Sequence, residues 1–308
     1  MEKIPVHIIS GFLGAGKTTA ILNLLSQKKT DEQWAIVVNE FGKVSIDGQT
    51  LKSTNTGEIF EITGGCICCT AKMYLNENLR NIIKSEKYSR IIIEPTGLGG
   101  IEMVTEIVEE NPILLLKPVI CLVDILMMKS PIKLSIPIFK RQIEKADAIV
   151  FTKNDLVPDE NEKVKLIQVF QTNFPDANIL TKSALDCTIL NLDASSFHVK
   201  MSSSKFSLYE PGLSLDNYWQ KNYIFDVETV FEPAKISELF RKYPSILRAK
   251  GTIRTNDGWK LLNYTLTDCV LDDCPTADTN EFVIISEKTN SELINNFEKL
   301  LESVKYTN

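Results

Sequence analysis

Nine residues near the N-terminus have the types and the spacing needed to hold phosphate. They are Gly11-Phe12-Leu13-Gly14-Ala15-Gly16-Lys17-Thr18-Thr19, which match the pattern G-x-x-x-x-G-K-[ST]. Glycines in this pattern let the backbone curve around phosphate with its N–H groups directed inward. We expect Lys17 to reach the β- and γ-phosphates of a nucleotide and Thr18 to bind Mg²⁺. We also expect the Lys17 ammonium to be solvated when no nucleotide is bound. The candidate nucleotide contacts in this loop are Gly11, Gly14, Ala15, Gly16, Lys17, Thr18 and Thr19.

A second candidate group follows the short apolar run at residues 91–93. Glu94 ends this run, and Gly97 comes three residues later. An acid at this place in P-loop enzymes helps to hold Mg²⁺, often through water. Gly97 could present its backbone amide to the γ-phosphate. The alternative interpretation is a strand followed by a plain turn. On the first interpretation, Lys17 and Glu94 are candidate catalytic residues.

The segment Thr152-Lys153-Asn154-Asp155 has the form [N/T]-K-x-D, which selects guanine in GTPases, and it follows an apolar run. The Asp155 carboxylate would accept hydrogen bonds from the guanine N1–H and amino group, which adenine cannot match. Lys153 would pack its stem along the base. Ser183 and Ala184 match the small loop that usually contacts guanine O6. This motif has little specificity alone, but its order behind the P-loop and Glu94 favours GTP and GDP as ligands.

Three cysteines within four residues, Cys66, Cys68 and Cys69, place three sulfur donors in one segment. Such a set suits Zn²⁺ or another thiophilic divalent ion, with a fourth ligand from elsewhere in the protein or from solvent. The alternative is packing, because cysteine behaves well as a small apolar side chain. The odd total of seven cysteines and their tight cluster argue for reduced thiols or metal ligands over a disulfide framework.

The phosphate, acid and guanine segments each follow a short apolar run of the kind that forms buried parallel strands. The first such run is Val6–Ile9, and the residues after the P-loop predict a helix. The second run, Trp34–Val38, leads into an acidic loop beginning at Asn39-Glu40, where nucleotide-sensing switches usually sit. An ordinary exposed loop is the alternative there. We predict an α/β fold, in which residues 1–190 form a P-loop NTPase domain with a mostly parallel sheet flanked by helices.

The last third of the chain has a different character. Serines crowd residues 191–221 without periodicity, which predicts a linker. Residues 222–308 predict a small α+β domain. Its expected elements are a strand at Tyr223–Val230, a helix at Pro233–Tyr243, a hairpin of Leu247–Thr255 with Trp259–Thr267, a strand at Phe282–Ile285 and a helix at Ser291–Val304. We expect Cys269 and Cys274 to lie on a loop, and with no neighbouring histidine we predict no metal site there.

Composition narrows the classes of partner. The 308 residues contain 34 Lys and Arg against 40 Asp and Glu, a formal net charge of −6, which argues against a nucleic-acid partner. No apolar run reaches membrane-spanning length. The N-terminus enters the first predicted strand directly and leaves no room for a signal peptide, so we expect a cytoplasmic protein.

The ordered segments GFLGAGKTT, NEFG…ID, GGCICC, IIIEPTGL and TKND, followed by Leu247-Arg248-Ala249-Lys250-Gly251, resemble the CobW-type metallochaperone GTPases. These proteins are relatives of the nickel-delivery GTPases HypB and UreG, in the SIMIBI branch of P-loop proteins. The resemblance covers nearly the whole chain. It implies GTP hydrolysis, Mg²⁺, a transition metal held by the cysteine loop between two switch regions, and a CobW-like C-terminal domain.

The resemblance also implies roles for residues that the motifs alone leave open. It makes Asp47 the candidate for positioning the attacking water. Relatives carry carboxylates where this chain has Val38 and Lys43, so the fourth metal donor remains open between water, Glu40 and a group of the client. Related proteins often dimerise with nucleotide between the protomers, and a nucleotide-dependent homodimer is therefore open for this chain.

Two functional hypotheses follow, because the Thr152-Lys153-Asn154-Asp155 sequence argues against a third, a P-loop kinase. The favoured one is a Mg²⁺-dependent GTPase that couples GTP binding and hydrolysis to the binding and delivery of a transition metal, with zinc the favoured ion, or of a metal cofactor. The recipient would be a client metalloprotein that the sequence does not identify. The competing hypothesis is a nucleotide-dependent protein that holds a client or a cofactor, for example a corrinoid-related one, with negligible turnover. Slow turnover that neither metal nor client accelerates would favour the second.

Overall fold

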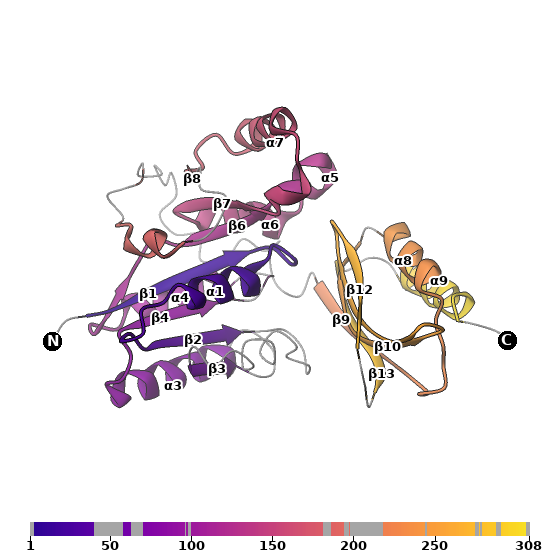
Figure 1. Cartoon of the computed structure of the whole chain (residues 1–308), viewed down its shortest axis with the longest axis horizontal. Helices are drawn as coiled ribbons and strands as arrows, with labels where there is room; N and C mark the ends of the chain where they lie inside the picture. Colours follow the sequence, from indigo (N-terminus) through magenta and orange to yellow (C-terminus); the bar gives the residue numbers. More distant parts are fainter. Residues whose placement is uncertain are drawn as a thin grey trace. The chain divides into compact units, whose positions relative to one another are not determined.

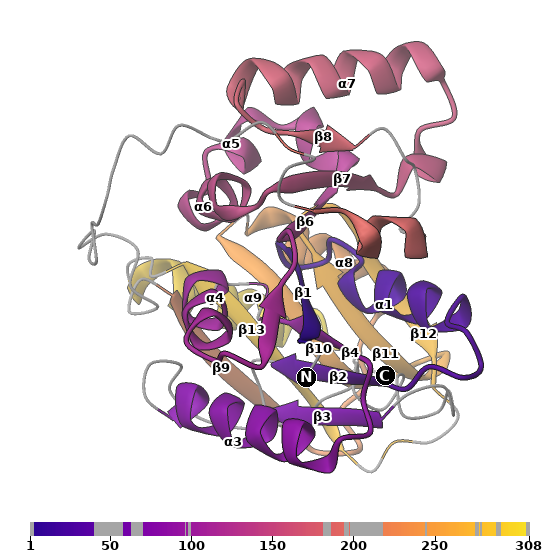
Figure 2. The same cartoon turned by 90° about the vertical axis from the view of Figure 1, so that its left-hand side faces the viewer.

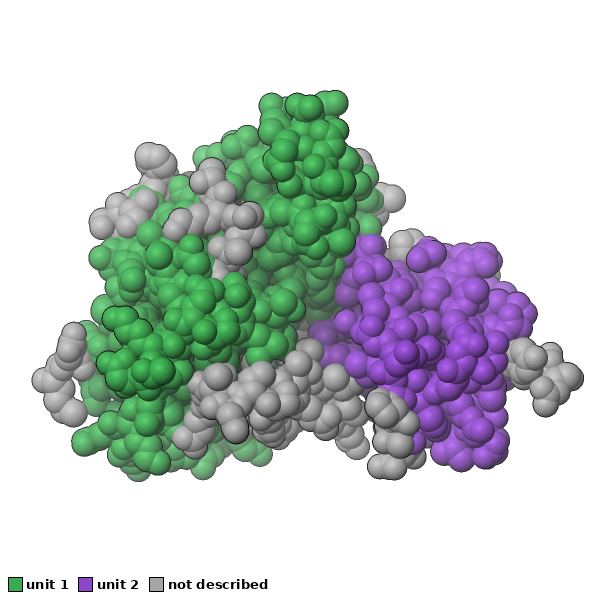
Figure 3. Space-filling model, in the orientation of Figure 1, with its two compact units in different colours: residues 1–207 green, residues 208–308 purple. Residues whose placement is uncertain are grey.

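The computed structural model of the chain describes residues 3–39, 58–62, 70–95, 97, 100–180, 186–193, 197, 218–243, 245–274, 277, 279–287 and 291–305. The chain divides into two compact units, Met1–Ser207 and Leu208–Asn308, coloured green and purple in Figure 3. Most of the predicted linker at residues 191–221 lies outside the described residues. The limits that we predict for the linker and the two domains therefore stay predictions.

Unit 1 alternates strands and helices along the chain (Figure 1). Its strands are β1 (Ile4–Gly11), β2 (Trp34–Asn39), β3 (Glu58–Ile62), β4 (Arg90–Glu94), β5 (Leu114–Leu116), β6 (Ile120–Asp124), β7 (Ala148–Thr152) and β8 (Ile179–Leu180). Its α-helices are α1 (Lys17–Ser26), α3 (Thr70–Ser85), α4 (Ile101–Glu109), α5 (Pro131–Leu134), α6 (Pro137–Lys145) and α7 (Glu160–Asn173). Its 3₁₀-helices are η1 (Ile125–Lys129), η2 (Asn154–Leu156) and η3 (Cys187–Asn191).

The strands of unit 1 form one sheet in the order β3-β2-β4-β1-β6-β7-β8, and β5 also pairs with β1. All these pairs are parallel within the described residues. Parallel neighbours need crossover connections, which here carry the helices. In Figure 2, α3, α4 and α6 lie on one side of the sheet and α1 lies on the other. The carboxyl ends of β1, β4, β6 and β7 therefore share one edge, where ligands bind in open α/β sheets.

The apolar runs form these strands because both faces of the sheet are covered. Every residue of β6, and residues 91–94 of β4, are buried. Side chains of α1 join the core on one face, where Ile21 and Leu24 are fully buried. Such continuous apolar runs are what a doubly covered parallel sheet requires.

Unit 2 is an antiparallel sheet with helices on one face, as Figure 1 shows. Its strand order is β12-β11-β10-β13-β9. Its elements are β9 (Tyr218–Phe225), α8 (Pro233–Lys242), β10 (Ile246–Thr255), β11 (Gly258–Thr265), β12 (Cys269–Asp273), β13 (Asn280–Glu287) and α9 (Ser291–Ser303). Aromatic rings fill the space between sheet and helices, with Phe240 of α8 stacked on Tyr264 of β11 at 5.0 Å and tilted against Phe297 of α9 at 5.9 Å.

The predicted fold class is confirmed: unit 1 has a mostly parallel sheet flanked by helices, and unit 2 is α+β. The predicted hairpin also forms, since Thr255 pairs with Gly258 across its turn. Two of the predictions for unit 2 are wrong. The strand predicted at Tyr223–Val230 ends at Phe225, because Asp226 turns the chain by accepting the Thr229 N–H through its carbonyl. Cys269 starts strand β12 and pairs with Tyr264, so it does not lie on a loop.

No helix among the described residues combines the length and the apolar composition that crossing a membrane requires. This finding concerns the described ranges alone.

One histidine is buried in the middle of β1. His7 is 1% exposed, and Nη1 of Arg90, the first residue of β4, makes a short hydrogen bond to its Nε2. The ring must accept from the guanidinium, which is a donor only, so it is held neutral. Burial, with smaller contributions from the charges of Arg90 and Lys117, lowers the pKa of His7 from 6.5 to about 3.

We therefore predict that His7 makes the protein less stable as the pH falls. Below about pH 6.5 the unfolded chain protonates this ring while the folded chain does not, which lowers the free energy of unfolding by roughly 1.4 kcal/mol per pH unit until about pH 3. His7→Gln keeps an acceptor for Arg90 and removes the titration. Urea unfolding between pH 6.5 and 4 should show a shallower pH dependence in the variant than in the parent. Parallel stability profiles would contradict this assignment.

Candidate functional site

The phosphate-binding loop joins β1 to α1 at the carboxyl edge of the sheet. Its turn is closed by a hydrogen bond from Ala15 N–H to Phe12 O, at 3.1 Å. Gly16 is the N-cap of α1 and has a φ of 82°, a left-handed conformation that residues with a β-carbon rarely adopt. The loop therefore delivers its backbone to the N-terminus of α1, where unpaired N–H groups and the helix dipole favour an anion.

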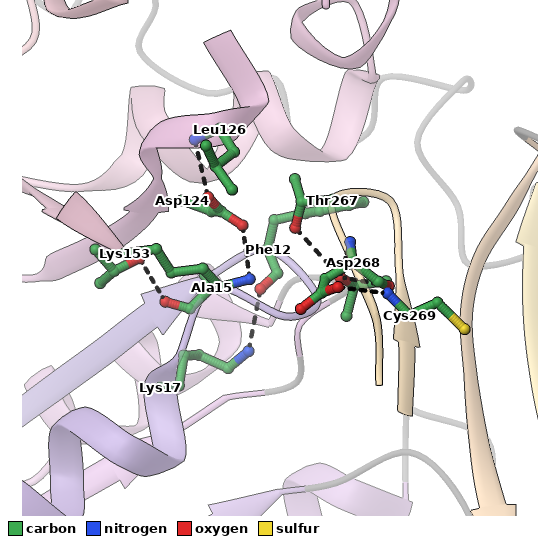
Figure 4. A network of polar contacts seen from close by, with 11 residues as sticks. Phe12, Ala15, Lys17, Asp124, Leu126, Lys153, Thr267, Asp268 and Cys269 are labelled. Atoms are coloured by element: carbon green, nitrogen blue, oxygen red, sulfur yellow. Dashed lines mark hydrogen bonds and ion pairs between the residues drawn. The ribbon is translucent and has the colours of Figure 1, made fainter. Parts of the chain in front are cut away.

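Lys17 points back into this loop (Figure 4). Its ammonium donates to Gly11 O at 3.1 Å and to Phe12 O at 3.4 Å, and it lies 4.0 Å from Oε1 of Glu94. The side chain is 7% exposed, so the expectation that Lys17 is solvated without nucleotide is wrong. Carbonyl oxygens at the end of β1 and the neighbouring carboxylate take the place of water. A phosphate that binds Lys17 must compete with them.

Glu94 lies where the sequence pattern places an acid, at the end of β4 beside β1. It is 6% exposed. Thr18, the neighbour of Lys17 in the first turn of α1, is half-buried, and Thr19 is exposed. A hydroxyl and a carboxylate are oxygen donors of the kind that Mg²⁺ prefers, so the residues at this edge fit that ion.

The guanine-motif residues lie at the end of β7, two strands from β1. Thr152 Oγ1 donates to Ala15 O at 2.9 Å, which ties the motif directly to the phosphate-binding loop. Lys153 has a φ of 57°, and its ammonium lies 2.8 Å from Oδ2 of Asp124. Asp155 is exposed at the surface of η2, where a base could reach its carboxylate.

Asp124 is a residue of this region that the motif search does not single out. It ends β6, is 4% exposed, and accepts the Leu126 N–H at 2.9 Å through its other oxygen (Figure 4). Its carboxylate thus holds the Lys153 ammonium and caps η1 at the same time. An acid at the end of a buried strand, next to the strand of the guanine motif, is the signal that could have found it.

Gly97 lies within the fold at the same edge, and its carbonyl accepts a hydrogen bond from Nε2 of Gln142 on α6 at 3.1 Å. Gln142 is also absent from the sequence candidates. The sequence does show that this glutamine lies on the apolar stripe of a helix, together with Ile138, Phe139 and Ile143, and this could have identified it.

Several candidates lie outside the described residues: Glu40, Asp47, Cys66, Cys68, Cys69, Ser183 and Ala184. Their predicted roles stay predictions. Within the described ranges, no group of three or more His, Cys, Asp and Glu side chains could hold a metal ion. The candidate zinc ligands Cys66, Cys68 and Cys69 lie outside these ranges, so this finding does not bear on them.

The matching family model and the similar sequences point to one family. The family model described as CobW/HypB/UreG, nucleotide-binding domain, matches residues 5–181. The zinc chaperone YeiR of Escherichia coli K12 is 32% identical over 282 residues, which cover 83% of this chain and 85% of that protein. The zinc chaperone YjiA of the same strain is 33% identical over 173 residues, 53% of each chain. The crystal structure of Zn(II)-bound YjiA GTPase aligns over 99% of this chain and 100% of that one, at 20% identity and a TM-score of 0.44.

The burial of Lys17 changes what its removal should do. Lys17→Ala takes away the cation beside the buried Glu94 carboxylate, and breaking a buried ion pair in this way lowers stability by about 3 kcal/mol. We expect Lys17→Ala to unfold at a lower urea concentration and to lose nucleotide binding. The double variant Lys17→Ala/Glu94→Gln removes both charges and should regain part of the stability without regaining nucleotide binding. Equal unfolding midpoints for Lys17→Ala and the parent would refute the energetic coupling.

Proposed function

The chain belongs to the CobW/HypB/UreG family, and from that premise we propose that it is a Mg²⁺-dependent GTPase that couples GTP binding and hydrolysis to the delivery of Zn²⁺ to a client metalloprotein. The observation that carries the proposal is the hydrogen bond between Thr152 and Ala15, which joins the guanine motif to the phosphate-binding loop. One nucleotide can therefore span both segments.

The phosphates of GTP would lie on the N-terminus of α1. Backbone N–H groups of the loop, with Lys17 beside them, would neutralise their charge as it grows on the bridging and terminal oxygens. Water attacks the γ-phosphorus, the bond to the bridging oxygen breaks, and GDP, phosphate and a proton are released. Asp47 is the residue proposed to orient that water, by resemblance to the family.

Thr18 and Glu94 would hold Mg²⁺, Glu94 either directly or through water. The ion supplies positive charge to the β- and γ-phosphate oxygens when bound. The protein's own contribution is to keep the two oxygen donors at one edge of the sheet. Glu94 also lies next to Lys17, so its carboxylate would hold the ammonium in place until phosphate binds to that ammonium.

Zn²⁺ is the cargo in this proposal. The relatives named zinc chaperones include YeiR and YjiA of E. coli and CobW of Pseudomonas aeruginosa, which supports zinc over other thiophilic ions. The ligands we propose are the thiolates of Cys66, Cys68 and Cys69, with a fourth donor from water, Glu40 or the client. A three-thiolate site with an exchangeable fourth ligand can release its ion to a better ligand set.

The proposal also implies a cellular compartment and binding partners for the protein. Free thiolates need a reducing compartment, so we assign the protein to the cytoplasm. The client is a metalloprotein that accepts the ion, and two copies of the chain could come together around nucleotide. A protein that only holds its client would bind GTP with the same residues but would show no acceleration of turnover by Zn²⁺ or client.

Guanine selectivity should depend on the charge of Asp155. Asp155→Asn replaces an acceptor of two hydrogen bonds by an amide, and each charge-assisted bond contributes about 1.5–3 kcal/mol. We expect GTP affinity to fall by at least roughly tenfold relative to ATP affinity, measured by calorimetry. Asp176→Asn, an exposed aspartate elsewhere in unit 1, makes the same charge change and should leave selectivity unaltered. Equal affinity of the parent for ATP and GTP would rule out the guanine assignment.

Zinc binding should depend on the cysteine cluster and on pH. Cys68→Ser should lower Zn²⁺ affinity and weaken any effect of Zn²⁺ on the GTPase rate, with GTP binding nearly unchanged. Affinity in the parent should fall with pH, because protons compete for the thiolates. A competition titration against a chromophoric chelator measures this, with Cys274→Ser of unit 2 as the matched control. If the parent and Cys68→Ser bind Zn²⁺ alike, the cluster is not the zinc site.

A further inference from the structure

Helix α6 contacts both the phosphate-binding loop and Gly97. Phe139 and Gln142 are three residues apart and therefore share one face of the helix. The ring of Phe139 packs edge to face with Phe12 of the loop, with centroids 6.1 Å apart and planes at 84°. Gln142 Nε2 donates to Gly97 O at 3.1 Å. One rigid element thus fixes the spacing between the loop that holds phosphate and the glycine proposed to sense its last group.

Gln142 is an unusual residue for its position. Its side chain is 1% exposed, on a helix face whose other buried members are Ile138, Phe139 and Ile143. A buried amide weakens the fold unless its groups are hydrogen-bonded, and Oε1 of Gln142 has no hydrogen-bond partner among the residues that the structure describes. Packing alone favours an apolar side chain there. What glutamine supplies there, and an apolar side chain does not, is the hydrogen-bond donor to Gly97.

Gly97 is confined on its other side by the phosphate-binding loop. A β-carbon added at Gly97 would lie 2.5 Å from Cδ2 of Leu13 and 3.2 Å from its Cα. A side chain at residue 97 would therefore require Leu13 to move, so Gly97 packs closely against the loop. Because glycine has no side chain to restrict its own torsions, the direction of its peptide groups depends on what its neighbours hold.

We propose that Gln142 is a positioning residue for Gly97. Its amide holds the carbonyl of Gly97, which restrains the position of that residue and its ψ torsion. The Gly97 N–H belongs to the preceding peptide group, so the bond acts on it by fixing where Gly97 meets the γ-phosphate. The inference rests on the proposed function, in which Gly97 contacts that group. GDP has no γ-phosphate, so Gln142 acts on the affinity for GTP and on turnover, and leaves the affinity for GDP unchanged.

Two variants remove the donor in different ways. Gln142→Met keeps the length of the side chain and replaces the amide by an apolar group, which also removes the unpaired Oε1. Gln142→Glu keeps the shape and faces the Gly97 carbonyl with a carboxylate. In both, we expect the affinity for a non-hydrolysable GTP analogue with Mg²⁺ to fall roughly tenfold, the size of one hydrogen bond. GDP affinity should stay within about twofold of the parent.

The matched control is the neighbouring residue on the same helix. Arg141 Nε donates to Glu102 Oε1 of α4 at 2.7 Å, and both side chains are more than a third exposed. Arg141→Met removes this contact between α6 and α4 without touching Gly97. It should leave the ratio of GTP-analogue to GDP affinity at the parent value. If Arg141→Met lowered this ratio as much as Gln142→Met does, a general loosening of α6 would explain both results and the inference would be overturned.

The measurement is calorimetric titration of each folded protein with the GTP analogue and with GDP, together with steady-state GTP turnover. Thermal melting identifies the variants that are folded, and Gln142→Met, which introduces no buried charge, is expected to be among them. An unchanged ratio in Gln142→Met overturns the inference, and so does a tighter GTP analogue, which would mean that the bond holds Gly97 away from phosphate. A parent that binds neither GTP nor GDP would defeat the proposed function as well.

Discussion

A lysine and a glutamate buried side by side at the edge of a parallel sheet constrain everything around them. Neither charge could be withdrawn from water alone, and the carbonyls at the end of β1 supply further acceptors to Lys17. The pair exists because β1 and β4 are parallel neighbours whose carboxyl ends coincide. Phosphate binding is then an exchange of partners, in which one anion replaces another at an ammonium that is already dehydrated.

The residues assigned to the base are also held by an ion pair and a hydrogen bond to neighbouring segments. Lys153, held in a left-handed conformation, is fixed by Asp124 from the adjacent strand, and Thr152 hydrogen-bonds the loop itself. The residues for base and phosphate are therefore connected through one backbone carbonyl, that of Ala15. On the opposite face of the sheet, α6 touches the loop through Phe139 and Gly97 through Gln142. The loop therefore makes contacts on both faces of the sheet.

Local patterns were enough to predict the alternation of strands and helices, the parallel sheet and the places of Lys17, Glu94 and Thr152. They depend on spacing along the chain and on the edge that parallel strands share. Burial of Lys17 was not predictable, because the motif names the residue and not the carbonyls beneath it. The pairing that makes Cys269 a strand residue and the contact of Gln142 with Gly97 join segments far apart in sequence. From a single sequence, Gln142 is visible only as a polar residue on the apolar stripe of a helix.

The bond between Thr152 and Ala15 links residues 137 positions apart. During synthesis at about 5–20 residues per second, the phosphate loop precedes its guanine partner by roughly ten seconds. Strand β1 also waits for β4 and β6 before either of its edges is covered, which makes unit 1 a fold of high contact order. A nascent chain contains the residues of the phosphate loop well before it contains those that distinguish guanine from adenine. Guanine-selective binding therefore requires synthesis to have passed β7 and η2, long after the phosphate loop has been made.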